Sequence, residues 1–301
     1  MDDPTPLSAP EMFALGWNHD TIRTALRRGE VTRLRRGAYL IGTPDDALLA
    51  HLSLVRATAA SIGGDTVFSH LSAAAMWGMP MWRLHPGRQV WVTRRGPTRG
   101  NIRGPAHAHN CLWTEDEVTV VDGVPVTTVA RTVVDLARRW GPDAGVVAAD
   151  WALAQGIERS ELLDVLAVHR RRPGVRAARM VVPFASARAE SPAESVSRLR
   201  MHQLGIPTPL EQVVITNEYG VELARSDFGW MEHMVLGECD GRTKYDQPRT
   251  GARPSDAVAA EKIRDRRLRE QGYHLVHWLP EDLDRPQTFG RMLRRALQIT
   301  T

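Results

Sequence analysis

Apolar residues near the start of the chain recur first at helical spacing and then at strand spacing. Ser8 and Glu11 have the spacing of a capping box that opens a helix in "SAPEMFAL", and "HDTIRTALRRGE" places its apolar residues on one face of a second helix. "VTRLRRGAYLIG" then alternates around Arg36 and Gly37, which is typical of a β-hairpin. Two helices and a hairpin in so short a segment predict a small winged helix-turn-helix over residues 1–44.

The middle of the chain mixes both kinds of periodicity. Helical patterns such as "ALLAHLSLVRATAASIG" and "VARTVVDLARRWG" alternate with short strand patterns, "QVWVTRR" and "GVPVTTV", which predicts one α/β region over residues 45–185. His107 and His109 lie at strand spacing, but no nearby acid or cysteine completes a metal site, so we interpret them as structural. Arg131 and Asp135 lie four residues apart on a predicted helix, which indicates a surface ion pair.

A new start follows at "ESPAESVSRLRMHQLG", where Ser191 is a predicted N-cap, Pro192 takes the first helical position and Glu194 the third. Three strand patterns, "EQVVIT", "VELARSDFGW" and "MVLGECDG", come next, and a helix and a last strand, "YHLVHWL", complete the order α-β-β-β-α-β. We expect a third domain over residues 186–301 with a central mixed sheet. The whole chain is therefore predicted to be of the α/β (α+β) class.

Carboxylates gather on two of these strands. Glu238 and Asp240 are two residues apart in a strand and project from the same face, and a hairpin from the preceding strand can bring Asp227 beside them. Like charges on one face need a cation between them, which is Mg²⁺, arginine or lysine. We expect Asp227, Glu238 and Asp240 to hold Mg²⁺ or Mn²⁺. Simpler roles remain open, because Glu194 has the position of a capping-box acid and Asp227 can pair with Arg225.

Composition narrows the class of protein. The chain has 301 residues, of which 43% are hydrophobic and 25% charged, and no apolar run reaches the length of about 18 residues that a membrane helix needs. The N-terminus is acidic and proline-rich, unlike a signal peptide. Cys111 and Cys239 support neither a disulfide framework nor a cysteine zinc site, so we interpret both as structural and expect a cytoplasmic protein.

Positive charge is concentrated in arginine near the N-terminus. The net charge is +4, and Lys244 and Lys262 are the lysines among 39 basic residues. Arginine binds phosphate in a bidentate manner, so its placement indicates where nucleic acid binds. With Glu30 as the one acid among them, six arginines of the second helix and the hairpin predict a DNA-binding surface: Arg23, Arg27, Arg28, Arg33, Arg35 and Arg36. A later basic segment, "HRRRPGVRAARM", is a second possible contact with nucleic acid.

Motifs along the whole chain resemble a known family. "LRRGEVTRLRRGAYL", "SHLSAAAMWGMP" and "GVPVTTVARTVVDLARR", followed by "AESPAESVSRLRMHQLGIPTP", "DFGW", "GECDGRTKY" and "EKIRDRRLREQGYHLVHW", are similar to actinobacterial proteins that join an AbiEi-type antitoxin winged helix to a very-short-patch-repair-like domain of the restriction-endonuclease-like (PD-(D/E)xK) fold. The resemblance implies a catalytic set of four acids and two basic partners: Glu194, Asp227, Glu238, Asp240, Lys244 and Lys262.

The chain departs from that pattern at two positions. Asp240 stands where the catalytic lysine of the superfamily is expected, so Lys244 would have to take its role. His277 stands where the family more often has arginine, and we interpret it as an ordinary histidine at the end of a strand.

Two functions follow from these observations. The first is a DNA-binding protein with a Mg²⁺-dependent endonuclease site, related to toxin–antitoxin or phage-defence systems. The second is a non-catalytic, antitoxin-type transcriptional regulator with a degenerate nuclease fold. Both predict DNA as a partner, and the resemblance adds a cognate toxin.

Overall fold

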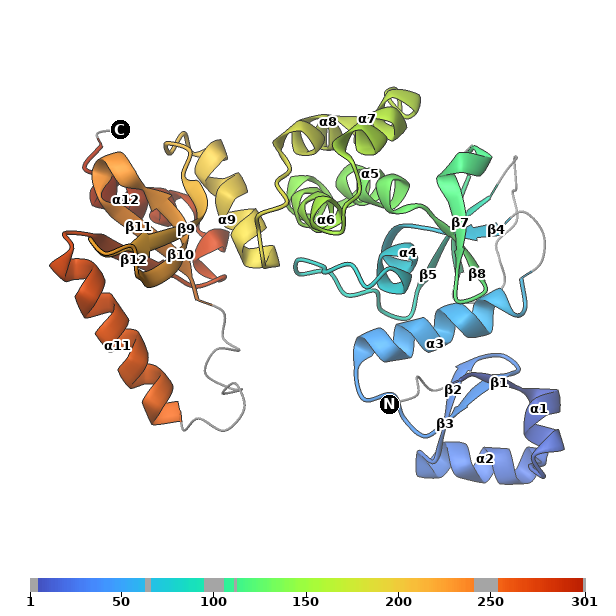
Figure 1. Cartoon of the computed structure of the whole chain (residues 1–301). Helices are drawn as coiled ribbons and strands as arrows, with labels where there is room; N and C mark the ends of the chain where they lie inside the picture. Colours follow the sequence, from blue (N-terminus) through green and yellow to red (C-terminus); the bar gives the residue numbers. More distant parts are fainter. Residues whose placement is uncertain (1–4, 63–65, 95–105, 111–112, 241–253, 300–301) are drawn as a thin grey trace. The chain divides into compact units, whose positions relative to one another are not determined.

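The computed structural model describes residues 5–62, 66–94, 106–110, 113–240 and 254–299. The chain divides into two compact units, Met1–Phe184 and Ala185–Thr301, and each combines helices with sheets, which confirms the predicted mixture of α and β structure (Figure 1). The division into three domains at residues 44 and 185 stays a prediction. No helix in the described part of the chain is long and apolar enough to cross a membrane.

The first unit begins with two helices and a three-stranded antiparallel sheet of order β1-β3-β2. Their bounds are α1 Ala9–Ala14, α2 His19–Arg28, β1 Leu7–Ser8, β2 Val31–Arg35 and β3 Ala38–Ile41. The predicted capping box of α1 is present, because Ser8 N–H donates to Glu11 Oε2 over 2.6 Å and Glu11 N–H donates to Ser8 Oγ over 3.4 Å. Gly29 ends α2 in the left-handed conformation, at φ 73°. These elements enclose a small core of Met12, Ile22, Ala25 and Val31.

A bulge in β2 joins this part to the rest of the unit. Arg33 pairs with Tyr39 and Arg35 with Ala38, so Leu34 is the additional residue on the β2 side. Leu34 packs on the apolar cluster of the middle region, which α3 (Ala47–Ala59) lines with Leu54. The hairpin is therefore held against α3.

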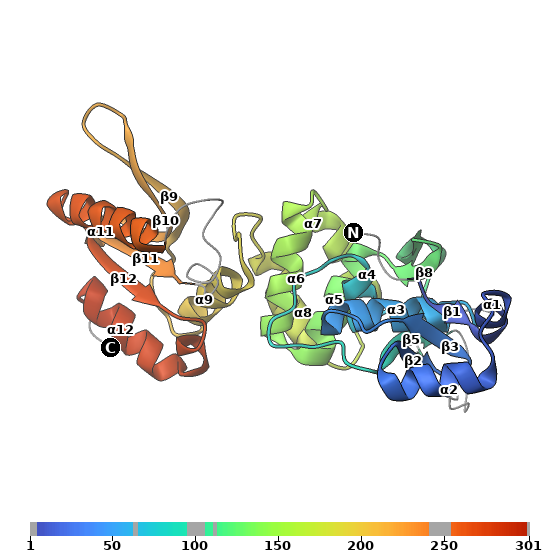
Figure 2. The same cartoon turned by 90° about the horizontal axis from the view of Figure 1, so that it is seen from below.

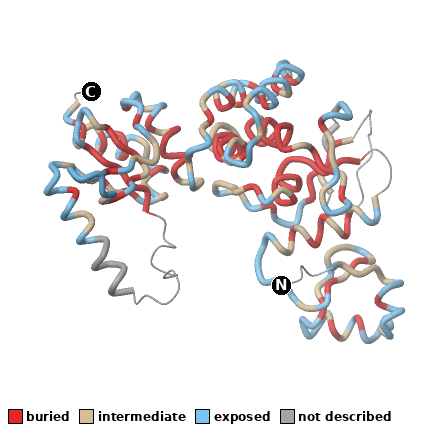
Figure 3. The backbone as a smooth tube through the Cα atoms, viewed as in Figure 1, coloured by how far each residue is buried: buried red, intermediate tan, exposed pale blue. Residues whose placement is uncertain are grey.

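The middle region contains a five-stranded mixed sheet of order β6-β5-β4-β8-β7. The strands are β4 Thr66–Phe68, β5 Val90–Arg94, β6 Ala106–Asn110, β7 Val118–Val121 and β8 Val124–Thr127, with the 3-10 helix η1 at Glu115–Glu117. The helices are α4 His70–Met76, α5 Val129–Trp140, α6 Pro142–Ala154, α7 Arg159–Val168 and α8 Val175–Phe184. Burial is greatest along α4, α5 and α6 (Figure 3), and α5 and α6 approach closely where Gly145 faces Ala137.

Over residues 192–278 the helices and strands of the second unit follow the predicted order α-β-β-β-α-β, seen from another side in Figure 2, and the 3-10 helices and a last α-helix are additions that the sequence patterns did not predict. The elements of the unit are α9 Pro192–Gln203, β9 Leu210–Thr216, β10 Glu222–Trp230, β11 Val235–Cys239, α11 Pro254–Glu270, β12 His274–Trp278 and α12 Pro286–Leu297, with 3-10 helices η2 Met231–His233 and η3 Asp282–Asp284. The sheet order is β12-β11-β10-β9. β12 pairs with β11 in parallel, and the other two pairs are antiparallel.

Each face of this second sheet has its own apolar core. Leu236 of β11 and Leu268 of α11 belong to one buried cluster. On the other side, Trp278 stacks on Phe228 with ring centroids 5.7 Å apart and meets Phe289 of α12 edge-on at 5.3 Å. The alternation of β11 thus separates the α11 side of the sheet from the α12 side.

Candidate functional site

Neighbouring strands bring two acids and a histidine together in the second unit. Glu238 of β11 lies opposite His277 of β12 in the parallel register, and Asp240 follows two residues after Glu238. His277 Nδ1 lies 3.0 Å from Asp240 Oδ2 and 3.9 Å from Glu238 Oε2. One ligand atom from each residue lies within 4.8 Å of the others. Both acids are buried, at 3% and 9% exposure, so their charges require partners.

Cationic side chains of the protein partly neutralise the charges of Glu238 and Asp240. Arg264 of α11 donates to Glu238 Oε2 over 2.8 Å and to Asp265 Oδ1 over 3.2 Å, and His277 Nε2 lies 3.8 Å from Asp265. The hydrogen bond to Asp240 raises the pKa of His277, burial opposes this, and the charges of Asp240 and Glu238 raise it further. The repulsion between the two carboxylates is therefore offset by an arginine and a histidine.

The same donors also fit a divalent metal. Two carboxylates and an imidazole within 4.8 Å are a donor set that suits Mn²⁺ and other transition metals, whereas Mg²⁺ prefers oxygen ligands alone. A metal there would have to share Glu238 with Arg264.

Asp227 and Glu194, the other predicted acids, have different contacts. Asp227 Oδ2 accepts a hydrogen bond from Cys239 N–H over 2.8 Å. Glu194 N–H donates to Ser191 Oγ over 3.2 Å, so Ser191 is the predicted N-cap, while the Glu194 carboxylate accepts from Ser191 Oγ over 2.7 Å and from Gln212 Nε2 over 2.8 Å. Burial raises the pKa of Glu194, and the charge of nearby Asp227 contributes. Asp227 therefore lies close to Glu194 and Cys239.

The thiol of Cys239 is buried beside these acids. Burial is the main reason that its pKa is raised to about 12, and the charges of Asp227, Glu194 and Asp240 add to the rise. It stays protonated at neutral pH, which agrees with a structural role.

Sequence reasoning missed three members of the Glu238 cluster. His277 was interpreted as an ordinary histidine, which is wrong, because it pairs with Asp240, and Arg264 and Asp265 were not considered. The signal that could have found His277 is parallel pairing of the last two strands, which sets it beside Glu238. Of the predicted basic partners, Lys262 is an exposed residue of α11 and Lys244 lies outside the described residues, so their catalytic roles stay predictions.

The predicted DNA-binding arginines divide into two groups. Arg23, Arg27 and Arg28 are exposed on α2, where Arg23 pairs with Asp20 at 2.7 Å. In the hairpin, Arg33 and Arg36 are exposed, whereas Arg35 is partly buried and donates to Ser61 Oγ just beyond α3. Arg35 therefore holds the hairpin in place.

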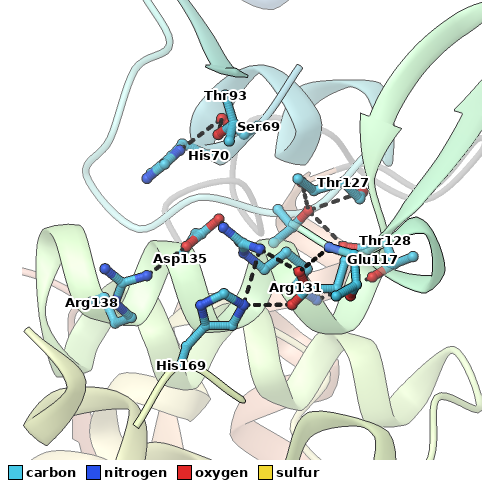
Figure 4. A network of polar contacts seen from close by, with 12 residues as sticks. Ser69, His70, Thr93, Glu117, Thr127, Thr128, Arg131, Asp135, Arg138 and His169 are labelled. Atoms are coloured by element: carbon cyan, nitrogen blue, oxygen red, sulfur yellow. Dashed lines mark hydrogen bonds and ion pairs between the residues drawn. The ribbon is translucent and has the colours of Figure 1, made fainter. Parts of the chain in front are cut away.

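A buried polar network lies in the middle region (Figure 4). Arg131 donates to Asp135 Oδ2 and to Glu117 Oε2, each over 2.8 Å, and His169 Nε2 lies 2.5 Å from Glu117 Oε1. Arg138 donates to the second oxygen of Asp135 over 3.0 Å. The prediction of a surface ion pair between Arg131 and Asp135 is wrong, because both side chains are only 1% exposed. Glu117, 14 residues away, is the partner that helical spacing did not reveal.

The middle region matches a known protein family. Residues 66–183 match the family model of the AbiEi antitoxin C-terminal domain, which links the chain to toxin–antitoxin systems. The match covers the five-stranded sheet, the helices α4 to α8 and the buried network.

Whole-chain relatives come from Mycobacterium tuberculosis. The chain is 30% identical over 277 residues to the uncharacterized protein Rv2248 of strain H37Rv and to the uncharacterized protein MT2308 of strain CDC 1551, covering 90% of this chain and 92% of each relative. It belongs to the same family as these proteins. The crystal structure of the Rv2827c protein from M. tuberculosis aligns with a TM-score of 0.41 and 16% identity over 65% of this chain and 76% of that one, a likeness too low to define a common fold.

Proposed function

We propose that this protein is a DNA-binding regulator of antitoxin type in a toxin–antitoxin or phage-defence system. The observation that carries the proposal is an exposed arginine surface on α2 and the β2-β3 hairpin, in the same unit as the AbiEi antitoxin domain. In this proposal α1 and α2 form a helix-turn-helix and the hairpin is its wing. A cognate toxin is the protein partner that the antitoxin domain implies.

The hairpin arginines provide the test. In Arg33→Gln/Arg36→Gln two phosphate contacts are removed, so duplex DNA of any sequence should bind more weakly and the salt slope of log K should fall by about 0.9 per contact, or about 1.8 in total. Arg35 is left unchanged because it bonds Ser61. Fluorescence anisotropy of labelled duplexes across a salt series measures both quantities.

A matched control removes the same charge elsewhere. Arg266→Gln/Arg267→Gln alters two exposed arginines of α11 and should leave affinity and slope near the wild-type values. Equal binding by the hairpin variant and the wild type would disprove the wing assignment.

A second proposal is a metal-dependent endonuclease site in the second unit. It is supported by the order of α9, the four strands and α11, and by the cluster of Glu238, Asp240 and His277. In this proposal the unit has the restriction-endonuclease-like fold, and Asp227 and Glu194 stand near the cluster as further acids. Mg²⁺ or Mn²⁺ bound there would supply Lewis-acid activation of water for phosphodiester hydrolysis. Two features favour the first proposal, a non-catalytic regulator. Asp240 stands where the superfamily has its catalytic lysine, and Glu238 is paired with Arg264.

Calorimetry of the wild type and of Asp240→Asn distinguishes a metal site from an ion-pair network. If the cluster holds a metal, Mn²⁺ should raise the melting temperature of the wild type, since saturation at 100 times Kd is worth about 2.7 kcal/mol, and Asp240→Asn should blunt the rise. The variant keeps the shape of the side chain and removes one donor charge. Glu232→Gln, which neutralises an exposed acid of the same unit, is the control and should respond to Mn²⁺ as the wild type does.

Catalysis requires a further measurement. Incubation of supercoiled and mismatched DNA with Mn²⁺ or Mg²⁺ should give nicking by the wild type and none by Glu238→Gln if the site is catalytic. A wild type whose melting temperature is indifferent to both metals would rule out the metal site. The cluster is then an ion-pair network, and Asp240→Asn would cost about 1–3 kcal/mol without metal.

A further inference from the structure

An open groove of about 1090 Å³ runs beside the last strand of the second unit. Its lining comes from β12, at the end of the four-stranded sheet as described, from α12 and from His233 of η2. Figures 1 and 2 show α12 beside β12. The sequence patterns did not point to this groove, although β12 and α12 follow one another along the chain.

The groove is lined by basic groups. Arg291 and Arg295 of α12 face it together with His233, His274 and His277, and its described lining contains no carboxylate. Arg291 and Arg295 are exposed and lie four residues apart, so they stand on the same side of α12, about 5–6 Å apart at Cβ. Arg291 is positioned by donating to Thr288 Oγ1 over 3.2 Å. Arg294, between them, instead donates to Leu204 O within the unit.

This arrangement suits a row of phosphates. Two guanidinium groups at one-turn spacing can each donate to a different phosphate of one strand, and arginine matches phosphate geometry in a bidentate manner. Apolar side chains of the lining, Met234 and Met292, offer contact surface for sugars. The groove is open to solvent, so a nucleic-acid backbone can enter it.

The groove also adjoins the acid cluster. His277 belongs to both, because it lines the groove and pairs with Asp240 on the α11 side of the sheet. His277 is therefore the one described residue that links the groove lining to the acid cluster.

We propose that this groove binds the sugar-phosphate backbone of DNA and gives the second unit a DNA contact of its own. The inference rests on the proposed function, since it takes the same DNA as ligand, but it concerns different residues. Side-chain donors in a row favour a nucleic acid over an acidic peptide, which would also use the backbone edge of β12.

The test is Arg291→Gln/Arg295→Gln in the full-length chain. Loss of two phosphate contacts should weaken binding to a fluorescein-labelled duplex on the order of tenfold and lower the salt slope by about 1.8. Arg266→Gln/Arg267→Gln, with the same charge change outside the groove lining, should bind as the wild type does. Calorimetry checks folding, and if the double variant is unstable, Arg295→Gln alone should lower the slope by about 0.9.

Comparison with the hairpin variant separates the two proposals. If Arg33→Gln/Arg36→Gln weakens binding and the groove variant does not, the groove inference fails and the proposed function stands. If neither variant weakens binding, both fail. A labelled polyglutamate peptide is the competing probe: its binding by the wild type and loss in the groove variant, with DNA affinity unchanged, would overturn the inference in favour of an acidic protein partner.

Discussion

Replacement of Arg131 by methionine is expected to lower the free energy of unfolding by about 3–5 kcal/mol. Arg131 is fully buried and contacts Glu117 and Asp135, both of which are also buried. Methionine fills much of the same volume, so the cost comes from two carboxylates left in the interior without their shared cation. Chemical denaturation of the two proteins at neutral pH measures the difference.

The dependence of this loss on pH identifies its cause. Burial alone would raise the pKa of Asp135, but His70 first, and then the charges of Arg131 and Arg138, hold it below its ordinary value. For Glu117 burial again acts upward, and the His169 hydrogen bond and the Arg131 charge outweigh it. In the wild type these acids therefore stabilise the fold above their unfolded pKa, and the contribution is lost as pH falls through the folded pKa.

In Arg131→Met the sign reverses, because carboxyls without the cation have raised pKa values and gain protons on folding. The difference between variant and wild type should therefore shrink from pH 7 towards pH 5. Arg139→Met is the control: Arg139 is exposed on the same helix, over the Trp91 and Trp140 rings at 5.7 and 5.6 Å, and its loss should cost less than about 1 kcal/mol. A loss in Arg131→Met that is constant with pH would point to packing rather than charge.

Gly237→Ala is expected to destabilise the second unit by about 1–3 kcal/mol. A Cβ at Gly237 would lie 2.7 Å from Cη2 and 2.8 Å from Cζ3 of Trp278. Trp278 cannot easily yield, because its ring packs between Phe228 and Phe289 and its Nε1–H donates to Ser197 Oγ over 2.8 Å. Thermal unfolding followed by tryptophan fluorescence and calorimetry reports the loss.

A double-mutant cycle shows whether the clash is responsible. Trp278→Phe deletes the two ring atoms that the new methyl group would meet, so the cost of Gly237→Ala should be smaller in that background. Strictly additive losses would contradict the steric explanation. The same pair bears on the site, since β11 carries Gly237 and Glu238 on opposite faces, and a shift of β11 would displace Glu238 from Arg264.

Sequence patterns predicted helix starts and a hairpin turn correctly where these depend on neighbouring residues. The capping patterns at Ser8 and Ser191 each begin a helix in the structure, because the serine hydroxyl accepts a hydrogen bond from the backbone N–H three residues later. The turn at Arg36 and Gly37 joins β2 to β3 as predicted, with Gly37 at φ 76°. These outcomes need no information from distant parts of the chain.

The predicted acids illustrate the limit of such reasoning. Alternation within one strand set Glu238 and Asp240 on a common face, and antiparallel pairing of β10 with β11 followed from their order. These sequence patterns did not reveal which cations pair with the acids. Arg264 and His277 lie 26 and 37 residues beyond their acidic partners Glu238 and Asp240, and only the packing of α11 and β12 brings them into contact.

The sequence by itself determined where the helices after Ser8 and Ser191 begin, the β2-β3 hairpin and the shared face of the two acids, since the period of the backbone and the capping hydrogen bonds act over a few residues. The tertiary structure alone decided what is buried and what is paired. Arg131 and Asp135 have the spacing of a surface pair, yet η1 brings Glu117 and the end of α7 brings His169 over them, and the pair becomes the centre of an interior network. Burial depends on which distant segments cover a helix face, and the spacing of residues along one helix does not predict which segments these are.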